Sequence, residues 1–182
     1  MAAPANDDIA NATVIGSLPV SLTGSTVEAT QQSGEPNTAW NWSTNHSVWF
    51  VYQPTATGNV AFNTNGSDFD TTLTVWSTTG DNAFGSLTLV TENDDSPYGL
   101  PSEVNFTVTQ GLTYYIELDG FGSSTGDYVL ASGSLAPNPA PTVSSVQVDT
   151  TDTTLHLGQQ ASLIVALSAD VLVTGTPTLS LN

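Results

Sequence analysis

Apolar residues recur at every second position along almost the whole chain, in short segments bounded by Gly, Pro, Asn, Asp or Ser. A period of two places alternate side chains on opposite faces of an extended strand, so the pattern predicts an all-β protein. Two packed antiparallel sheets, a β-sandwich of jelly-roll type, are the economical arrangement for the eight strands that we expect. These strands are expected at residues 19–26, 47–53, 58–64, 71–77, 86–91, 102–109, 112–118 and 127–132.

The pattern also predicts how the chain is divided. One helical turn is expected over residues 7–14, whose acids at the N-terminal end suit the helix dipole. The Pro-rich residues 135–142 indicate an extended, semi-rigid linker, which separates a sandwich of residues 1–134 from residues 143–182. An immunoglobulin-type sandwich needs roughly 100 residues. We therefore expect residues 143–182 to form an incomplete immunoglobulin-like β unit, with strands at 143–148, 154–157, 161–167 and 178–181.

The charged residues are all acidic. The 182 residues include 17 Asp and Glu and no Lys or Arg, which gives a formal charge of -17. This excludes nucleic acid as a partner, because phosphates are bound through Lys and Arg, and it argues against an anionic membrane surface. Clustered carboxylates have no cationic side chain to pair with apart from two His residues. Oxygen-rich sites suit Ca²⁺, so the composition predicts Ca²⁺ as the cofactor.

Other compositional features concern the setting of the protein. The absence of Cys excludes disulfides and thiolate zinc sites. No apolar stretch approaches the length of a membrane span, and the first residues lack a basic segment followed by an apolar one. We interpret the chain as a secreted or cell-surface piece of a larger exported protein, or one whose signal was removed, without membrane insertion.

A set of short motifs follows in order along the first unit: NDDIANAT (6–13), GEPN (34–37), SVWF (47–50), SDFDTTLTVW (67–76), ENDD (92–95) and TYYIELDG (113–120). Over about residues 6–134 this set resembles the bacterial pre-peptidase C-terminal domain family. The resemblance implies a jelly-roll-like β-sandwich that is a non-catalytic appendage of secreted proteases, collagenases or large surface proteins. Several members bind calcium or an extracellular polymer. Residues 173–182 resemble the start of an immunoglobulin-like repeat of giant bacterial adhesins.

The acids in these motifs are candidate calcium ligands. Asp68 and Asp70 flank Phe69, so in an extended chain both carboxylates project to one side. The alternative is that the Asp and Asn residues only form Asx turns. The N-terminal acidic motif of the family often reads EPND, whereas this chain has Ala5-Asn6-Asp7-Asp8 at that place. We expect one site from Asp7, Asp8 and Glu35, and a second from Asp68, Asp70, Asp94 and Asp95 beside Asn93.

Three aromatic residues are candidates for ligand binding. Trp40 and Trp42 lie in a polar segment of Asn, Thr and Ser, and Tyr98 lies in the acidic segment after Asp95. Exposed aromatic faces beside polar groups suit a glycan or peptide ligand. The alternative is that the tryptophans cover one end of the sandwich.

Catalysis has little support in the sequence, which lacks G-x-S-x-G, H-E-x-x-H and a Gly-rich phosphate loop. We expect a non-catalytic, calcium-stabilised module of a larger bacterial protein that serves adhesion or binding of an extracellular glycan or peptide, next to other domains of that protein. One alternative is the accessory C-terminal domain of a secreted peptidase. Another is a fibre subunit, in which the incomplete C-terminal unit self-associates by strand exchange.

Overall fold

The computed structural model describes residues 2–36, 46–80, 84–97, 99–134, 136–137, 142–149 and 162–168. The chain divides into two compact units, Met1–Asn138 and Pro139–Asn182, which are described separately. Among the described residues, no helix has the length and apolar character needed to cross a membrane.

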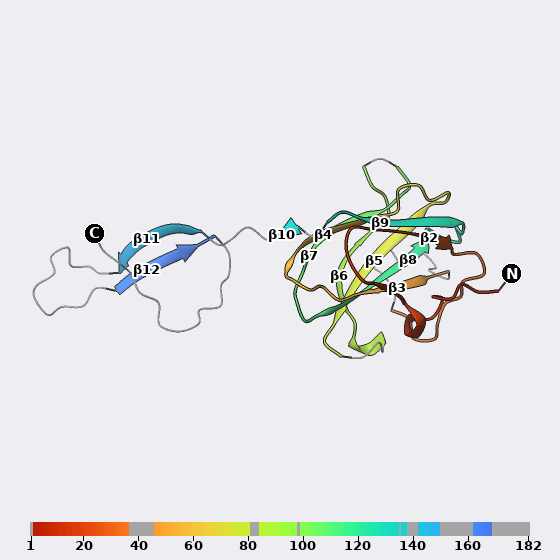
Figure 1. The fold of residues 1–182 in the computed structure, drawn as a ribbon, viewed down its shortest axis with the longest axis horizontal. Helices are drawn as coiled ribbons and strands as arrows, with labels where there is room; N and C mark the ends of the chain where they lie inside the picture. The colour runs from red at the N-terminus through yellow and green to blue at the C-terminus, as the bar shows by residue number, and fades with distance from the viewer. Residues whose placement is uncertain are drawn as a thin grey trace, which may run out of the picture. The chain divides into compact units, whose positions relative to one another are not determined.

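The first unit is a β-sandwich (Figure 1). Sheet A has the strand order β1-β3-β8-β5-β6, and sheet B has the order β10-β4-β9-β2, with β7 on the other edge of β4. The strands of sheet A are β1 (Thr13–Ile15), β3 (Val48–Tyr52), β5 (Thr71–Thr78), β6 (Thr88–Asn93) and β8 (Thr113–Gly120). Those of sheet B are β2 (Val20–Ser25), β4 (Gly58–Asn63), β7 (Glu103–Val108), β9 (Asp127–Ser132) and β10 (Ala136–Pro137).

Strands β2 to β9 are divided between the two sheets, in the order β3-β8-β5-β6 in sheet A and β2-β9-β4-β7 in sheet B. This interleaved order of eight antiparallel strands is that of a jelly roll. The prediction of an all-β, jelly-roll-like sandwich is confirmed, and each of the eight expected strands overlaps an observed one. The largest shift is at β6, which follows a 3₁₀ turn, η2 (Phe84–Ser86), and so begins and ends two residues later than expected.

Two apolar clusters hold the unit together, one on each face of sheet A. The first lies between the sheets and includes Phe50, Phe62 and Leu118, none of them more than 1% exposed. The second lies on the outer face of sheet A and consists of Ile9, Trp49, Trp76 and Tyr115 with partly buried neighbours such as Phe84. Alternation along β3 and β8 supplies both clusters, because neighbouring residues of a strand face opposite sides.

The N-terminal segment is less helical than expected. Only a 3₁₀ turn, η1 (Ile9–Asn11), forms, and Thr13–Ile15 then add β1 to sheet A, parallel to β3. Asn6 binds the same region: its carbonyl accepts from the Trp49 N–H at 2.9 Å, and its amide Nδ2 donates to the Trp49 carbonyl at 3.1 Å. These contacts with β3 outweigh the helical propensity of so short a segment.

The expected linker is in part a strand. Ala136 and Pro137 form β10, which pairs antiparallel with Asn59 and Gly58 of β4. Proline is compatible with such a short edge strand, where its missing N–H costs no ladder bond.

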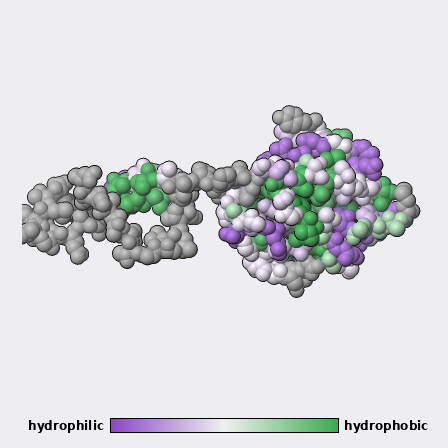
Figure 2. Space-filling view, in the orientation of Figure 1, coloured by the Kyte–Doolittle hydropathy of each residue, from purple (hydrophilic) through white to green (hydrophobic). Residues whose placement is uncertain are grey.

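The second unit contains an antiparallel hairpin, β11 (Val143–Asp149) and β12 (Ser162–Leu167). Val146 pairs with Val165, and Val143 pairs with Leu167 across a bulge, so these four residues share one face. All four are exposed, and Figure 2 shows apolar atoms gathered over this hairpin. A two-stranded sheet with an exposed apolar face has marginal stability in water. The expected strands at 154–157 and 178–181 lie outside the described residues.

A glycine at the end of β8 tests the packing of the sandwich. A Cβ at Gly120 would overlap the backbone carbonyl of Ser124. We expect Gly120→Ala to lower the free energy of unfolding by about 2 kcal/mol or more, since the backbone must shift. Gly133→Ala is the matched control, because its Cβ meets nothing within 4 Å. Urea unfolding of both variants measures the difference, and equal stability would contradict the packing described.

Candidate functional site

Three acids converge at one end of sheet A. Asp70 immediately precedes β5, and Asp94 and Asp95 immediately follow β6. Because β5 and β6 are antiparallel, with Leu73 paired to Asn93, the start of one strand lies beside the end of the other. One carboxylate oxygen from each acid lies within 4.8 Å of the other two. Two oxygens on opposite sides of a Ca²⁺ ion, at about 2.4 Å each, are separated by about this distance.

The electrostatics of this triad (Asp70, Asp94 and Asp95) are unfavourable without a cation. One carboxylate oxygen, Oδ1, of Asp70 and of Asp94 is buried without a hydrogen-bond partner among the described residues. The pKa of Asp94 is raised by burial and then by the charges of Asp70 and Asp95. The pKa of Asp70 is raised by burial and by Asp95. A bound divalent cation would remove both the repulsion and the unmet hydrogen-bonding capacity.

Buried hydroxyl and amide groups hold the backbone around the triad. The Ser102 hydroxyl donates to the Asp94 carbonyl oxygen at 2.6 Å, and it also lies against the Thr71 carbonyl. Asn93 uses both ends of its amide: Oδ1 accepts from the Glu103 N–H at 2.9 Å, and Nδ2 donates to the Asp95 carbonyl at 3.1 Å. Asn93 therefore shapes the turn on which two of the acids lie.

Asp68 lies apart from the triad. Its Oδ1 accepts from the Asp127 N–H at 2.8 Å, while its own N–H donates to the Asp127 carbonyl at 3.1 Å. The side chain thus joins the segment before β5 to β9 of sheet B. The structure brings together three of the four acids that we grouped in the second site.

The acids of the first expected site are held by hydrogen bonds within the chain. Asp7 accepts from the Thr30 N–H at 2.6 Å and the Thr30 hydroxyl at 2.9 Å. Glu35 is buried, with Oε1 facing the Ser47 hydroxyl and the Trp49 indole N–H, and Oε2 accepting from the Gln32 N–H. Burial raises the pKa of Glu35, and the charge of Asp7 raises it further.

Asp8 is exposed and precedes η1 without capping it through its side chain. Among the described residues, Asp7, Asp8 and Glu35 do not converge as the triad does. The three expected ligand-binding aromatics, Trp40, Trp42 and Tyr98, lie outside the described residues.

Sequence reasoning missed two buried acids on β8. Glu117 is 2% exposed and Asp119 is 1% exposed, and both lie on the outer face of sheet A. Glu117 accepts from the Trp76 indole N–H at 2.8 Å, and Asp119 accepts from the Gly120 N–H at 2.6 Å. The sequence signal was the alternation along β8, which places both acids on one face of the strand. In a sandwich whose outer face is exposed, such acids are expected in solvent, but here a second apolar cluster covers the outer face of sheet A.

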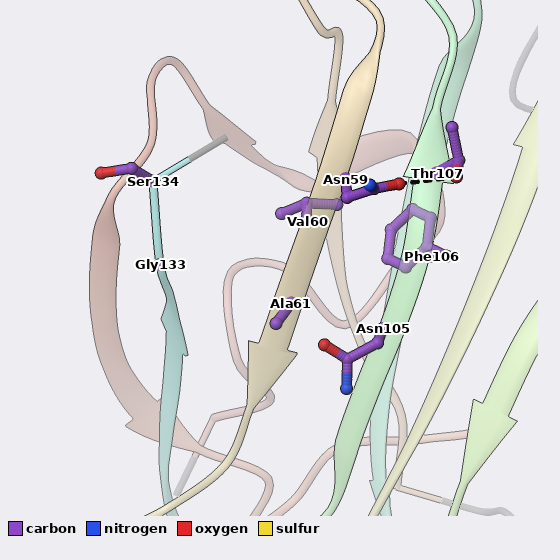
Figure 3. A pocket seen from close by; sticks show the side chains of 8 residues that line it. All are labelled: Asn59, Val60, Ala61, Asn105, Phe106, Thr107, Gly133 and Ser134. Carbon is purple, nitrogen blue, oxygen red and sulfur yellow. Dashed lines mark hydrogen bonds between the residues drawn. The ribbon is translucent and has the colours of Figure 1, made fainter. Parts of the chain in front are cut away.

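A shallow groove of about 420 Å³ lies elsewhere, on sheet B (Figure 3). Its wall combines apolar side chains such as Phe106 and Val60 with polar ones, and the Thr107 hydroxyl donates to the Asn59 side-chain oxygen at 2.8 Å. It is lined by Asn59, Val60, Ala61, Asn105, Phe106, Thr107, Gly133 and Ser134. None of the expected site residues that the structure describes lines it.

The hydroxyl network beneath the triad gives a testable consequence. Ser102→Ala removes the donor to Asp94 and leaves buried acceptors unmet, so we expect it to lower the free energy of unfolding by about 1–3 kcal/mol. Ser21→Ala, at an exposed position of β2, is the control and should change stability by less than about 0.5 kcal/mol. Chemical denaturation measures both, and a Ser102→Ala variant as stable as the control would contradict this role.

Comparisons with known proteins concern the fold. The structure is similar to the pre-peptidase C-terminal domain of a collagenase from Bacillus anthracis, with 17% sequence identity and a TM-score of 0.45 over 66% of this chain and 93% of that one. It is also similar to the Yersinia pseudotuberculosis-derived mitogen, with 16% identity and a TM-score of 0.39 over 68% of this chain and 92% of that one. No family model and no curated protein matches the sequence. The first of these structures comes from the family that the motifs of residues 6–134 resemble.

Proposed function

We propose that the first unit is a non-catalytic, calcium-stabilised extracellular module of a larger bacterial secreted or surface protein. The triad at the start of β5 and the end of β6 carries this proposal. It has three carboxylates at the spacing of cation ligands and two buried oxygens without partners in the part of the chain that the structure describes, and the sequence has no Lys or Arg to neutralise them.

The chemistry of the triad favours Ca²⁺ over other cations. All of its ligands are carboxylate oxygens, which suit hard cations such as Ca²⁺ and Mg²⁺, whereas softer transition metals such as Zn²⁺ and Cu²⁺ favour nitrogen or sulfur ligands. Ca²⁺ accepts six to eight oxygens in flexible geometry, so backbone carbonyls and water can complete its shell around an irregular turn. Mg²⁺ demands a near-ideal octahedron and keeps most of its water. The triad therefore suits Ca²⁺ better.

A bound ion would act on the loop after β6. Asp94 and Asp95 begin the connection from β6 to β7, and Asp70 precedes β5. An ion bound by all three would therefore link this connection to the start of β5. Tyr98 follows Asp95 by three residues in the sequence. Ordering of the loop by calcium would couple metal binding to the glycan or peptide binding that we propose for Tyr98 with Trp40 and Trp42.

The placement of the module in its parent protein has two candidates. The motifs of residues 6–134 resemble accessory domains that adjoin secreted peptidases, which favours a position beside a catalytic domain. The resemblance of residues 173–182 to adhesin repeats favours a tandem array on the cell surface. The adjoining coding sequence distinguishes the two, since a peptidase signature upstream supports the first and repeated sandwiches support the second.

Thermal unfolding with and without calcium tests the proposal. At a hundredfold excess over the dissociation constant, binding to the native state alone adds about 2.7 kcal/mol. We expect Ca²⁺ to raise the Tm of the chelator-treated protein, and Mg²⁺ at the same concentration to raise it much less. Calorimetry or circular dichroism measures this shift.

Variants assign the shift to the triad. Asp94→Asn should abolish the calcium-dependent rise in Tm, because it removes a charged ligand, while raising the Tm of the calcium-free protein by relieving repulsion. Asp127→Asn, which changes an exposed acid outside the triad, should keep the full shift. A Tm that does not respond to calcium, or a response that survives in Asp94→Asn, would overturn the assignment.

A further inference from the structure

The outer face of sheet A buries carboxyl groups without any cationic partner. Glu117 and Asp119 lie two residues apart on β8, and Glu35 approaches from the segment before β3. Oε1 of Glu117 is buried and has no hydrogen-bond partner within the described ranges of the chain. Among the described residues, the only Lys, Arg or His is His46. Its backbone N–H donates to Asp119 Oδ2 at 3.4 Å, and its Nδ1 is buried with no partner in the described part of the chain.

Each element packed around these carboxyls contributes few charges, and those present are mostly acidic. β3 and β5 place Trp49 and Thr74 on either side of Glu117. β6 places Glu92 beyond Thr74, and β8 itself carries Tyr115 on the same face. Of the residues that the structure describes, the titratable and charged groups facing the cluster are therefore Glu35, Glu92, Tyr115 and His46, with Asp7 acting on Glu35.

Two segments close over this face, residues 6–11 and 32–35, which we call the N-terminal cover. The Ile9 N–H donates to the Gln32 side-chain oxygen at 2.7 Å, which ties the two segments together. The cover is fixed to sheet A through Glu35, which binds Ser47 and Trp49, and through Asn6, which binds Trp49. It has no strand pairing of its own, whereas β8 is paired on both sides.

We propose that Glu117 and Asp119 form a proton-operated latch, which holds the N-terminal cover closed while they are protonated and loosens it when they ionise. Ionisation places two further negative charges beside the carboxylate of Glu35. Because β8 is held by its neighbours, the repulsion is relieved by movement of the segment that carries Glu35. Gln32 and Ile9 move with that segment, since they are bonded to each other.

The direction of the pH effect follows from the raised pKa values. Burial raises the pKa of Glu117 well above its ordinary range, with a further rise from the charge of Glu35. Burial likewise raises the pKa of Asp119 to about 7. Through Asp119, the folded chain thus binds more protons than the unfolded chain between about pH 4 and about pH 7, and Glu117 acts in the same direction. Folding stability and closure of the cover therefore fall as the pH rises through this range.

Hydrogen exchange on the full chain tests the latch. We expect the protection factors of the N–H groups of Asn11, Glu35 and Trp49 to fall at least tenfold between pH 5 and pH 8, after correction for the intrinsic exchange rate. Those of β4 and β7 in sheet B should stay higher at both pH values, because these strands exchange only when the whole unit unfolds. The measurement is made in chelator and again in calcium, because an effect of the triad would appear in the loop after β6. Protection in the cover that equals that of sheet B at pH 8, or no change in the cover, would overturn the proposal.

Variants identify the groups responsible. Glu117→Gln keeps an acceptor for the Trp76 indole and cannot ionise, so it should reduce the pH-dependent loss of protection in the cover. Glu103→Gln, the same change on a partly buried glutamate of sheet B, should leave that loss intact. A full pH effect in Glu117→Gln would overturn the role of Glu117.

A spectroscopic measurement on the unmodified chain keeps the test independent of variant folding. The indole N–H signals of Trp76 and Trp49, which donate to Glu117 and Glu35, should shift with pH in nuclear magnetic resonance spectra. Their midpoint should match the loss of protection in the cover. Indole signals that stay constant from pH 5 to pH 8 would contradict the latch.

Discussion

The structure depends on how a chain without Lys or Arg accommodates its carboxylates. A buried charge must be paired, hydrogen-bonded or neutralised. The only side chains of this sequence that could act as cationic partners are its two His residues. Most of the acids described above are met by N–H and O–H donors. Asp7 binds both donors of Thr30, Asp68 binds the backbone of Asp127, and Glu35 is bound by donors that include the Trp49 indole. These carboxylates act as cross-links between segments.

Two groups of acids are left incompletely satisfied, and they lie at different places on sheet A. At the triad, the carboxylates converge near the surface, within reach of a cation from solution. On the outer face, Glu117 is enclosed under the cover, where a proton is the smallest charge that can neutralise it. The same scarcity of basic residues therefore leads us to a metal site in one place and a proton site in the other.

The sequence predicted the strands well because each carries a period-two pattern that any sandwich must bury. It also predicted that acids before β5 and after β6 meet, since the motifs place them at the ends of strands. It could not predict that Asp68 turns towards β9 while Asp70 turns towards β6. This depends on how the two sheets pack together and on the register of β5 with β6. The burial of Glu117 escaped prediction for a related reason. Alternation gives the face of a strand, but only the tertiary fold shows that segments from residues 6–11 and 32–35 cover that face.

The short strand β10 has a mechanical consequence for a module within a longer chain. Tension that reaches the first unit from its C-terminal side acts first on β10, which pairs with β4 through only two residues. The strand before it, β9, is held to β2 along six paired residues and also contacts β4. Under load, β10 would peel away and release extra length while the jelly roll stays intact. The two residues Ala136 and Pro137 would thus serve as a small extensible joint, which absorbs strain before the sandwich itself is stretched.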